Sequence, residues 1–211
     1  DIDIWIDCDR WNMFKFVRSK FPTAKFKCQH IDFPIWEKTP VEIHFYPMYL
    51  ENLWANRKLQ QFFLEQREEQ FQNKIILPKT SEEICIPTPY FNAIYQLTHI
   101  NVHILIEGIG LRQFIDYYYV LQKLTDGERV KIAELVRNMN LGHLAASVMY
   151  IEKEILGLSE KYLYVSPDEK RGKHLMQEIE IGGNFGRFDT RMSVIHEGFI
   201  HRQIRKIINH S

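Results

Sequence analysis

Acidic side chains at the start of the chain have the type and spacing to bind a metal ion. Asp1 and Asp3 alternate with isoleucines in the opening segment Asp-Ile-Asp-Ile-Trp-Ile-Asp. This alternation predicts a strand over residues 1–7, with the carboxylates on one face and the isoleucines packed on a core. Alternate residues of a strand lie about 6.6 Å apart, so both carboxylates can bind the same one or two divalent cations.

A later segment repeats this pattern. In residues 41–46, Glu42 and His44 fall on one face of a predicted strand and apolar side chains fall on the other. If the two strands are neighbours in one sheet, Asp1, Asp3 and Glu42 form a three-carboxylate cluster that suits a divalent cation. The alternative is that these carboxylates only keep an exposed strand from aggregating.

Two histidines belong to the predicted hairpin around this segment. Residues 24–33 are expected to pair antiparallel with residues 41–46 across a turn from Pro34 to Pro40, and both His30 and His44 are expected near this hairpin. A histidine without a fixed partner is usually a surface or cross-strand residue, and we interpret both in this way. His44 is in addition a candidate contact for a phosphate group.

The second half of the chain carries further polar candidates on predicted helices. His99 and His103 have the i,i+4 spacing of helical metal sites, but no Glu follows His99, so the zinc-protease motif is absent. Core or capping roles explain them better. Arg112 and Asp116 have the spacing of a local ion pair. In the alternative interpretation, Arg112 or His103 faces the acidic sheet and binds phosphate.

The composition indicates a globular protein without a charge bias. The 211 residues are 45% hydrophobic and 13% aromatic, which is ample for a core. The 27 basic and 27 acidic side chains leave no net charge, so extended nucleic acid is not an expected partner. Three cysteines without Cys-x-x-Cys spacing predict a reducing compartment and no cysteine zinc site. We expect a cytoplasmic protein without a signal peptide or membrane span.

The order of the predicted elements indicates an α+β fold. A small mixed sheet is expected in residues 1–87 and a helical domain in residues 88–211. Because the chain opens inside a strand, we expect that an upstream piece has been removed. Residues 75–78 and 83–87 predict a small hairpin or two extended crossings. Helices are predicted at residues 10–20, 50–69, 89–106, 110–124, 126–138, 141–156, 167–181 and 189–209.

Several short motifs together resemble a poorly characterised bacterial nucleotidyltransferase family within the polymerase-beta-like superfamily. The resemblance runs over nearly the whole chain and depends on the order and spacing of the motifs. The stretch Glu-Ile-Glu-Ile-Gly-Gly-Asn-Phe-Gly at 178–186 looks like members from gut Bacteroides-type bacteria. The other motifs are Asp-Ile-Asp-Ile-Trp at 1–5, His-Ile-Asp-Phe at 30–33, Val-Glu-Ile-His-Phe at 41–45, the pair His99 and His103, and Gly-Leu-Arg-Gln-Phe-Ile-Asp at 110–116.

The resemblance implies transfer of a nucleoside monophosphate from a nucleoside triphosphate, with ATP expected, to a hydroxyl of an unknown small-molecule or protein acceptor. Two Mg²⁺ (or Mn²⁺) ions would bind the triphosphate and promote in-line attack, because negative charge concentrates on the phosphate oxygens. Asp1 and Asp3 match the metal-binding pair. Glu42 matches the third carboxylate, which would orient or deprotonate the acceptor hydroxyl. Arg112 and His103 are then expected to neutralise the triphosphate tail.

This chain departs from the family pattern in two ways, and two other functions follow as alternatives. The superfamily's glycine motif, which holds the β- and γ-phosphates, would lie upstream of residue 1, and Glu42 stands where Asp is more common. One alternative is a catalytically silent relative that acts as a binding or interaction module. The other is a metal-dependent phosphohydrolase that uses His99, His103 and Asp116.

Overall fold

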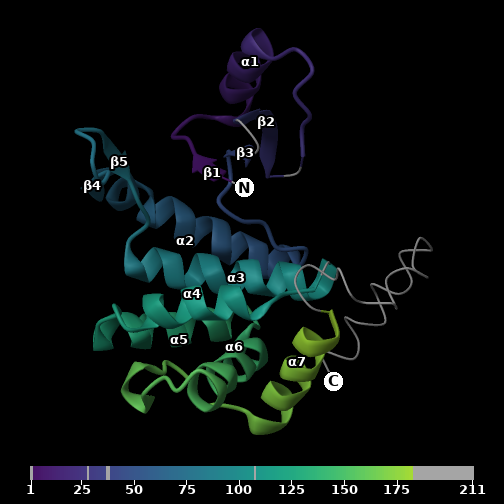
Figure 1. The fold of residues 1–211 in the computed structure, drawn as a ribbon, viewed down its shortest axis with the longest axis vertical. Helices are drawn as coiled ribbons and strands as arrows, with labels where there is room; N and C mark the ends of the chain where they lie inside the picture. The colour runs from purple at the N-terminus through teal and green to yellow at the C-terminus, as the bar shows by residue number, and fades with distance from the viewer. Residues whose placement is uncertain (1, 28, 37–38, 107, 183–211) are drawn as a thin grey trace, which may run out of the picture. The chain divides into compact units, whose positions relative to one another are not determined.

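The chain divides into two compact units, Asp1–Ile86 and Pro87–Ser211. Within the described residues, the strands all belong to the first unit and the second unit is helical. The protein therefore has a mixed α+β fold with a small mixed sheet. The computed structural model, drawn as a ribbon in Figure 1, describes residues 2–27, 29–36, 39–106 and 108–182.

The first unit is built on a three-stranded sheet with the strand order β1-β3-β2. β1 (Ile2–Trp5) is parallel to β3 (Thr39–His44), and β2 (His30–Trp36) is antiparallel to β3. The chain leaves β1 through helix α1 (Arg10–Lys20) before it forms the β2–β3 hairpin. This mixed order places the acidic first strand directly beside the strand that carries Glu42.

Helix α1 packs on one face of this sheet. Asp9 caps the start of the helix, and its side chain accepts hydrogen bonds of 3.0 Å from the backbone N–H groups of Trp11 and Asn12. Because side chains alternate along a strand, Asp3, Glu42 and His44 lie on the face of the sheet opposite α1. The core cluster that α1 shares with the sheet and its connections comprises Met13, Val17, Ala24, Ile31, Ile43 and Phe45.

A long helix and a second, smaller sheet complete the first unit. Helix α2 (Leu53–Gln72) is followed by β4 (Lys74–Ile76) and β5 (Glu83–Cys85), which pair antiparallel. Trp5 of β1 packs against Phe71 of α2, with ring centroids 5.0 Å apart. The antiparallel pairing of β4 with β5 confirms the hairpin that was one of the two predictions for residues 75–87. The contact between Trp5 and Phe71 joins the end of β1 to α2.

The second unit consists of helices joined by short connections. α3 packs against α4 and α5, and α6 packs against α7. A capping box between Thr125 and Glu128 begins α5. The helices are α3 (Pro89–Ile106), α4 (Leu111–Leu121), α5 (Asp126–Asn138), α6 (Gly142–Tyr150) and α7 (Glu169–Gly182), with a 3-10 turn, η2, at Glu160–Tyr162.

A buried carboxyl group lies where α6 continues into a π-helical turn, η1 (Ile151–Ile155). Glu152 is fully buried, and neither of its carboxyl oxygens has a hydrogen-bond partner among the described residues. Burial raises the pKa of Glu152 to about 9, so this carboxyl group is neutral at pH 7. In the same unit, the hydroxyl groups of Tyr117 and Tyr164 form a buried hydrogen bond of 2.9 Å.

The first strand differs from its prediction in length and in burial. β1 ends at Trp5, although the alternation predicted a strand over residues 1–7. Ile2 and Ile4 were expected to pack on a core, yet they are 44% and 42% exposed. The reason is that β1 is an edge strand, and the core under α1 reaches only Ile6 of the alternating isoleucines.

The remaining differences concern element boundaries. β2 begins at His30 and continues through Pro34 to Trp36, whereas residues 24–33 were predicted as the strand and Pro34 as part of a turn. Proline is tolerated there because β2 lies at an edge of the sheet. The predicted helix at 141–156 changes to a π-helical turn at Ile151. The predicted helix at 189–209 lies outside the described residues.

Candidate metal centre

The strand register gathers polar side chains on the face of the sheet opposite α1. Asp3 of β1 pairs with Glu42 of β3, and Glu42 pairs on its other side with Asp32 of β2. Two residues away along the hairpin, His30 is paired with His44. Because alternate residues of a strand share a face, these five side chains form one polar cluster.

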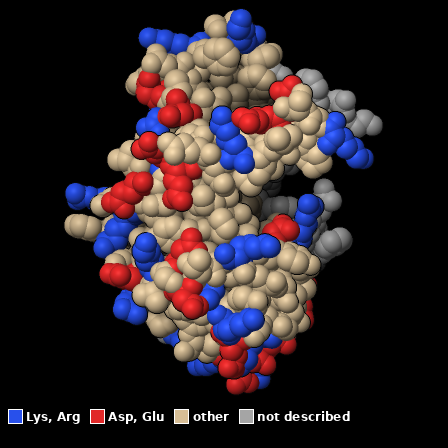
Figure 2. All heavy atoms as spheres, turned by 90° about the vertical axis from the view of Figure 1, so that its left-hand side faces the viewer, with Lys and Arg blue, Asp and Glu red and all other residues tan. Residues whose placement is uncertain are grey.

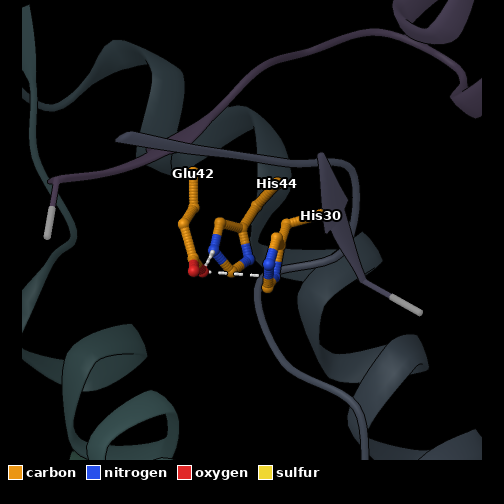
Figure 3. A group of neighbouring side chains, drawn as sticks. All are labelled: His30, Glu42 and His44. Carbon is orange, nitrogen blue, oxygen red and sulfur yellow. Dashed lines mark ion pairs between the residues drawn. The ribbon is translucent and has the colours of Figure 1, made fainter. Parts of the chain in front are cut away.

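The Glu42 carboxylate is the common neighbour of both imidazole rings. Its Oε2 atom lies 3.2 Å from Nδ1 of His30 and 3.4 Å from Nε2 of His44. Oδ1 of Asp3 lies 3.6 Å from the same nitrogen of His44. Figure 3 shows the carboxylate of Glu42 beside the two rings, whose centroids are 5.0 Å apart. One carboxylate oxygen and two ring nitrogens therefore converge.

Each imidazole ring has a second polar contact, made by the ring nitrogen that does not face Glu42. Nε2 of His30 lies 3.2 Å from Oδ1 of Asp32, and Nδ1 of His44 lies 3.2 Å from the carbonyl oxygen of Tyr46. Both of these partners are hydrogen-bond acceptors, so in a neutral imidazole these two nitrogens carry the proton. Nδ1 of His30 and Nε2 of His44 then present lone pairs to the cluster.

These two inward nitrogens are buried and lack a hydrogen-bond partner among the described residues. Only 9% of the His30 side chain and 5% of the His44 side chain is exposed. Their polar neighbours are the carboxylates of Glu42 and Asp3, which form ion pairs with the rings only when the rings are protonated. Proteins orient histidine ligands of metals in the same way, with one nitrogen donating to a carboxylate or carbonyl and the other free for the ion.

Burial and the neighbouring carboxylates act differently on the two rings. Burial lowers the pKa of His30, and this effect outweighs the opposing charge of Glu42. Burial also disfavours the charged form of His44, but the nearby carboxylates of Asp3 and Glu42 outweigh that cost and raise its pKa. The negative field that favours a proton on His44 also attracts a metal cation.

One lysine contacts the acidic side of the cluster. Nζ of Lys27 lies 3.1 Å from Oδ1 of Asp32 and 4.0 Å from Oε1 of Glu42. With Asp3 included, the cluster holds three carboxylates and this one ammonium group, and the two imidazoles are neutral when they act as ligands. The cluster therefore keeps an excess of negative charge that a divalent cation would neutralise.

The distances within the cluster fit a metal ion with nitrogen and oxygen ligands. Ligand atoms about 2.1 Å from a tetrahedral ion stand about 3.4 Å apart. The separations of 3.2 and 3.4 Å from Oε2 of Glu42 to the two histidines are close to this value. The ligand atoms of His30, Glu42 and His44 all lie within 4.8 Å of one another, and no second such group occurs in the described part of the chain.

The residues predicted as a metal and nucleotide site are distributed over both units. Asp3, Glu42 and His44 come together on the sheet. Asp1 lies outside the described residues. His103 lies on α3 and Arg112 on α4, both in the second unit, and their binding to phosphate stays a prediction.

The ligand set proposed for a phosphohydrolase does not assemble. Nε2 of His103 lies 2.9 Å from Nε2 of His99, so these two rings are close neighbours on α3. Asp116 lies on α4, and the three residues do not form a group of potential metal ligands among the described residues.

The sequence interpretation missed His30 and Asp32 as members of the cluster. The signal was present as His-x-Asp at 30–32 and Glu-x-His at 42–44, two alternating pairs on strands predicted to form one hairpin. Their meeting depends on strand register, which the sequence of the connection did not reveal.

Comparisons with known proteins leave the family of this chain open. No family model, curated protein or solved structure matches it. Within the described residues, no helix has both the length and the apolar character needed to cross a membrane. The function must therefore be argued from the side chains on the sheet.

Proposed function

We propose that this chain is a nucleotidyltransferase that depends on Mg²⁺ or Mn²⁺ and transfers a nucleoside monophosphate from a nucleoside triphosphate to a hydroxyl group. The observation that carries the proposal is the pairing of Asp3 with Glu42 across the parallel strands β1 and β3. Carboxylates on adjacent strands of one sheet face supply the hard oxygen ligands that these ions prefer. Asp1, two residues before Asp3, has the spacing to add a third carboxylate.

The residues around this pair fit the requirements of phosphoryl transfer. A divalent ion bound by Asp3 and Glu42 would neutralise the charge that develops on the phosphate oxygens. Glu42 is also a suitable group to orient or deprotonate the acceptor hydroxyl, since its side chain remains 21% exposed. Lys27, whose side chain is 53% exposed and 4.0 Å from Glu42, adds a cation that can contact a phosphate group.

The charge of the chain favours a small-molecule or protein acceptor over extended nucleic acid. Its 27 basic and 27 acidic side chains give no net charge. On the face drawn in Figure 2, basic and acidic side chains are interspersed. Proteins that bind extended nucleic acid ordinarily concentrate Lys and Arg on one surface. We therefore propose ATP as the donor to test first and non-polymeric hydroxyl compounds or proteins as the acceptors.

Calorimetric titration with ATP, in the presence and absence of Mg²⁺ or Mn²⁺, tests the proposal. ATP binding should require the divalent ion, and Asp3→Asn and Glu42→Gln should each weaken it by at least about 10–100-fold. Asp7→Asn is the matched control, because the Asp7 carboxylate pairs with Arg67. This control should bind ATP as the unaltered protein does.

The competing function is a binding or interaction module without catalysis. Such a module would tolerate the loss of both carboxylates. Absence of metal-dependent ATP binding, or equal binding by the Asp3→Asn and Glu42→Gln variants, would refute the transferase proposal and favour this second function.

A further inference from the structure

We infer that His30, Glu42 and His44 form a binding site for a first-row transition-metal ion, with Mn²⁺, Fe²⁺, Co²⁺ and Zn²⁺ as candidates. The ligand atoms are Nδ1 of His30, Nε2 of His44 and Oε2 of Glu42. Oδ1 of Asp3, at 3.6 Å from Nε2 of His44, is a suitable fourth ligand.

Two independent features of the rings point to a metal and not to a simple ion-pair cluster. First, both inward nitrogens are buried without a hydrogen-bond partner among the described residues, although Oε2 of Glu42 lies within 3.4 Å of each. Second, the opposite nitrogen of each ring contacts an acceptor, Asp32 for His30 and the Tyr46 carbonyl for His44. Both rings are thus prepared to offer a lone pair to the same point.

The ligand types select the class of ion. Imidazole nitrogen suits Zn²⁺, Fe²⁺ and related ions, whereas Mg²⁺ prefers oxygen ligands and retains several water molecules. A site with two imidazoles and one carboxylate therefore favours a transition metal over Mg²⁺. Within the proposed transferase, the same preference would favour Mn²⁺ over Mg²⁺ at Glu42.

The backbone supports this site without a long loop. His30 belongs to β2, and Glu42 and His44 belong to β3, and the pairing of His30 with His44 fixes the distance between the strands. The ligands therefore stand on a paired hairpin, which holds their spacing more firmly than a loop would. The metal centre shares Glu42 with the proposed nucleotide site, but its two histidines argue for it independently of nucleotide transfer.

Titration of metal-free, untagged protein with Co²⁺ tests the inference, with visible absorption and calorimetry as readouts. One ion per chain should bind, and the absorption should show nitrogen ligands; Zn²⁺ should displace Co²⁺. His30→Gln, His44→Gln and Glu42→Gln should each weaken Co²⁺ binding by at least about 10–100-fold. Circular dichroism and thermal denaturation establish that each variant is folded.

Two controls separate this site from other histidines. His174→Gln removes an exposed histidine of α7, and the double variant His99→Gln/His103→Gln removes the helical pair. Both should bind Co²⁺ with unchanged affinity. Retained binding by the His30→Gln and His44→Gln variants, loss of binding in the helical double variant, or no binding by the unaltered protein would overturn the inference.

A further variant guards against failure to fold and separates the two proposals. Asp32→Ala keeps all three ligands but removes the acceptor that orients His30, so Co²⁺ binding should weaken by about 10–100-fold. Tight Co²⁺ binding together with no ATP binding would refute nucleotide transfer and leave the metal centre standing. ATP binding without Co²⁺ binding would refute the metal centre and leave nucleotide transfer standing.

Discussion

Replacement of Glu152 by Gln should remove a pH dependence of stability that this one buried carboxyl group creates. Burial raises the pKa of Glu152 from an ordinary value of 4.5 to about 9 in the folded protein. Between these two values, the folded chain keeps a proton that the unfolded chain has lost. The free energy of unfolding is therefore not reduced by this group below pH 4.5, and it falls as the pH rises from 4.5 toward 9.

The size of the effect follows from the linkage between protonation and folding. Each pH unit in this window lowers the free energy of unfolding by about 1.4 kcal/mol. From the ordinary pKa of 4.5 up to pH 7, the loss amounts to about 3 kcal/mol, a large share of the typical 5–15 kcal/mol. Gln has a similar shape but no titrating proton, so Glu152→Gln should lack this slope.

Urea unfolding followed by circular dichroism, at several pH values between about 5.5 and 8.5, measures the effect. Glu154→Gln is the matched control, because Glu154 lies in the same turn but is exposed. The difference in unfolding free energy between Glu152→Gln and the unaltered protein should grow in favour of the variant by about 1.4 kcal/mol per pH unit. The Glu154→Gln difference should stay nearly constant. A constant difference for Glu152→Gln as well would show that Glu152 is charged when folded and would refute the reasoning.

Two further changes test packing and capping in the second unit. Gly172→Ala should destabilise the protein by about 1–3 kcal/mol in urea unfolding, because the added Cβ would approach Cβ of Tyr150 to 2.5 Å. Gly127→Ala is its control and should be neutral or stabilising by up to about 1 kcal/mol, since nothing lies within 4 Å of the added atom; an equal loss in both variants would contradict the packing argument. Thr125→Ala should cost about 0.5–2 kcal/mol, since it breaks the capping box with Glu128. Thr125→Ser keeps a capping hydroxyl and should lose much less stability than Thr125→Ala in the same assay. If Thr125→Ser is as unstable as Thr125→Ala, the capping argument is wrong.

The alternation of residue types predicted the carboxylate pair on the sheet. Asp3 and Glu42 were expected to meet if their strands were neighbours, and the parallel pairing of β1 with β3 confirms this. The same alternation overestimated the burial of Ile2 and Ile4, because it assigns them to the face that Ile43 shares but does not show that β1 lies at the edge of the sheet, beyond most of the core. In this sheet, α1 covers the face beneath Ile31 and Ile43.

The histidine pair was harder to predict than the carboxylate pair. His30 was placed on a strand, but Pro34 was interpreted as a turn, and the strand in fact begins at His30 and continues past Pro34. Register in a hairpin follows from the connection between its strands, and an irregularity between Phe33 and Trp36 shifts it here. The cross-strand pairing of His30 with His44 therefore emerged only from the structure.

In the helical unit, strong periodicity predicted the elements but not their local defects. The bounds of α3 (Pro89–Ile106) and α5 (Asp126–Asn138) agree with prediction, because a Pro start and a capping box mark their first turns. The π-helical turn at Ile151–Ile155 was predicted as ordinary α-helix. One turn with i→i+5 hydrogen bonds barely changes a helical pattern in the sequence, so Glu152 was not recognised as a buried carboxyl group.

The β2–β3 hairpin gives the metal cluster a property that matters for comparing distant proteins. His30, Glu42 and His44 all come from one contiguous stretch, and no other element is needed to supply these three ligands. Such a stretch can persist, be copied or be grafted into another sheet as a single block, because its spacing depends only on one hairpin register. The paired patterns His-x-Asp and Glu-x-His are therefore a short signature by which the same cluster can be sought in chains that share no other resemblance.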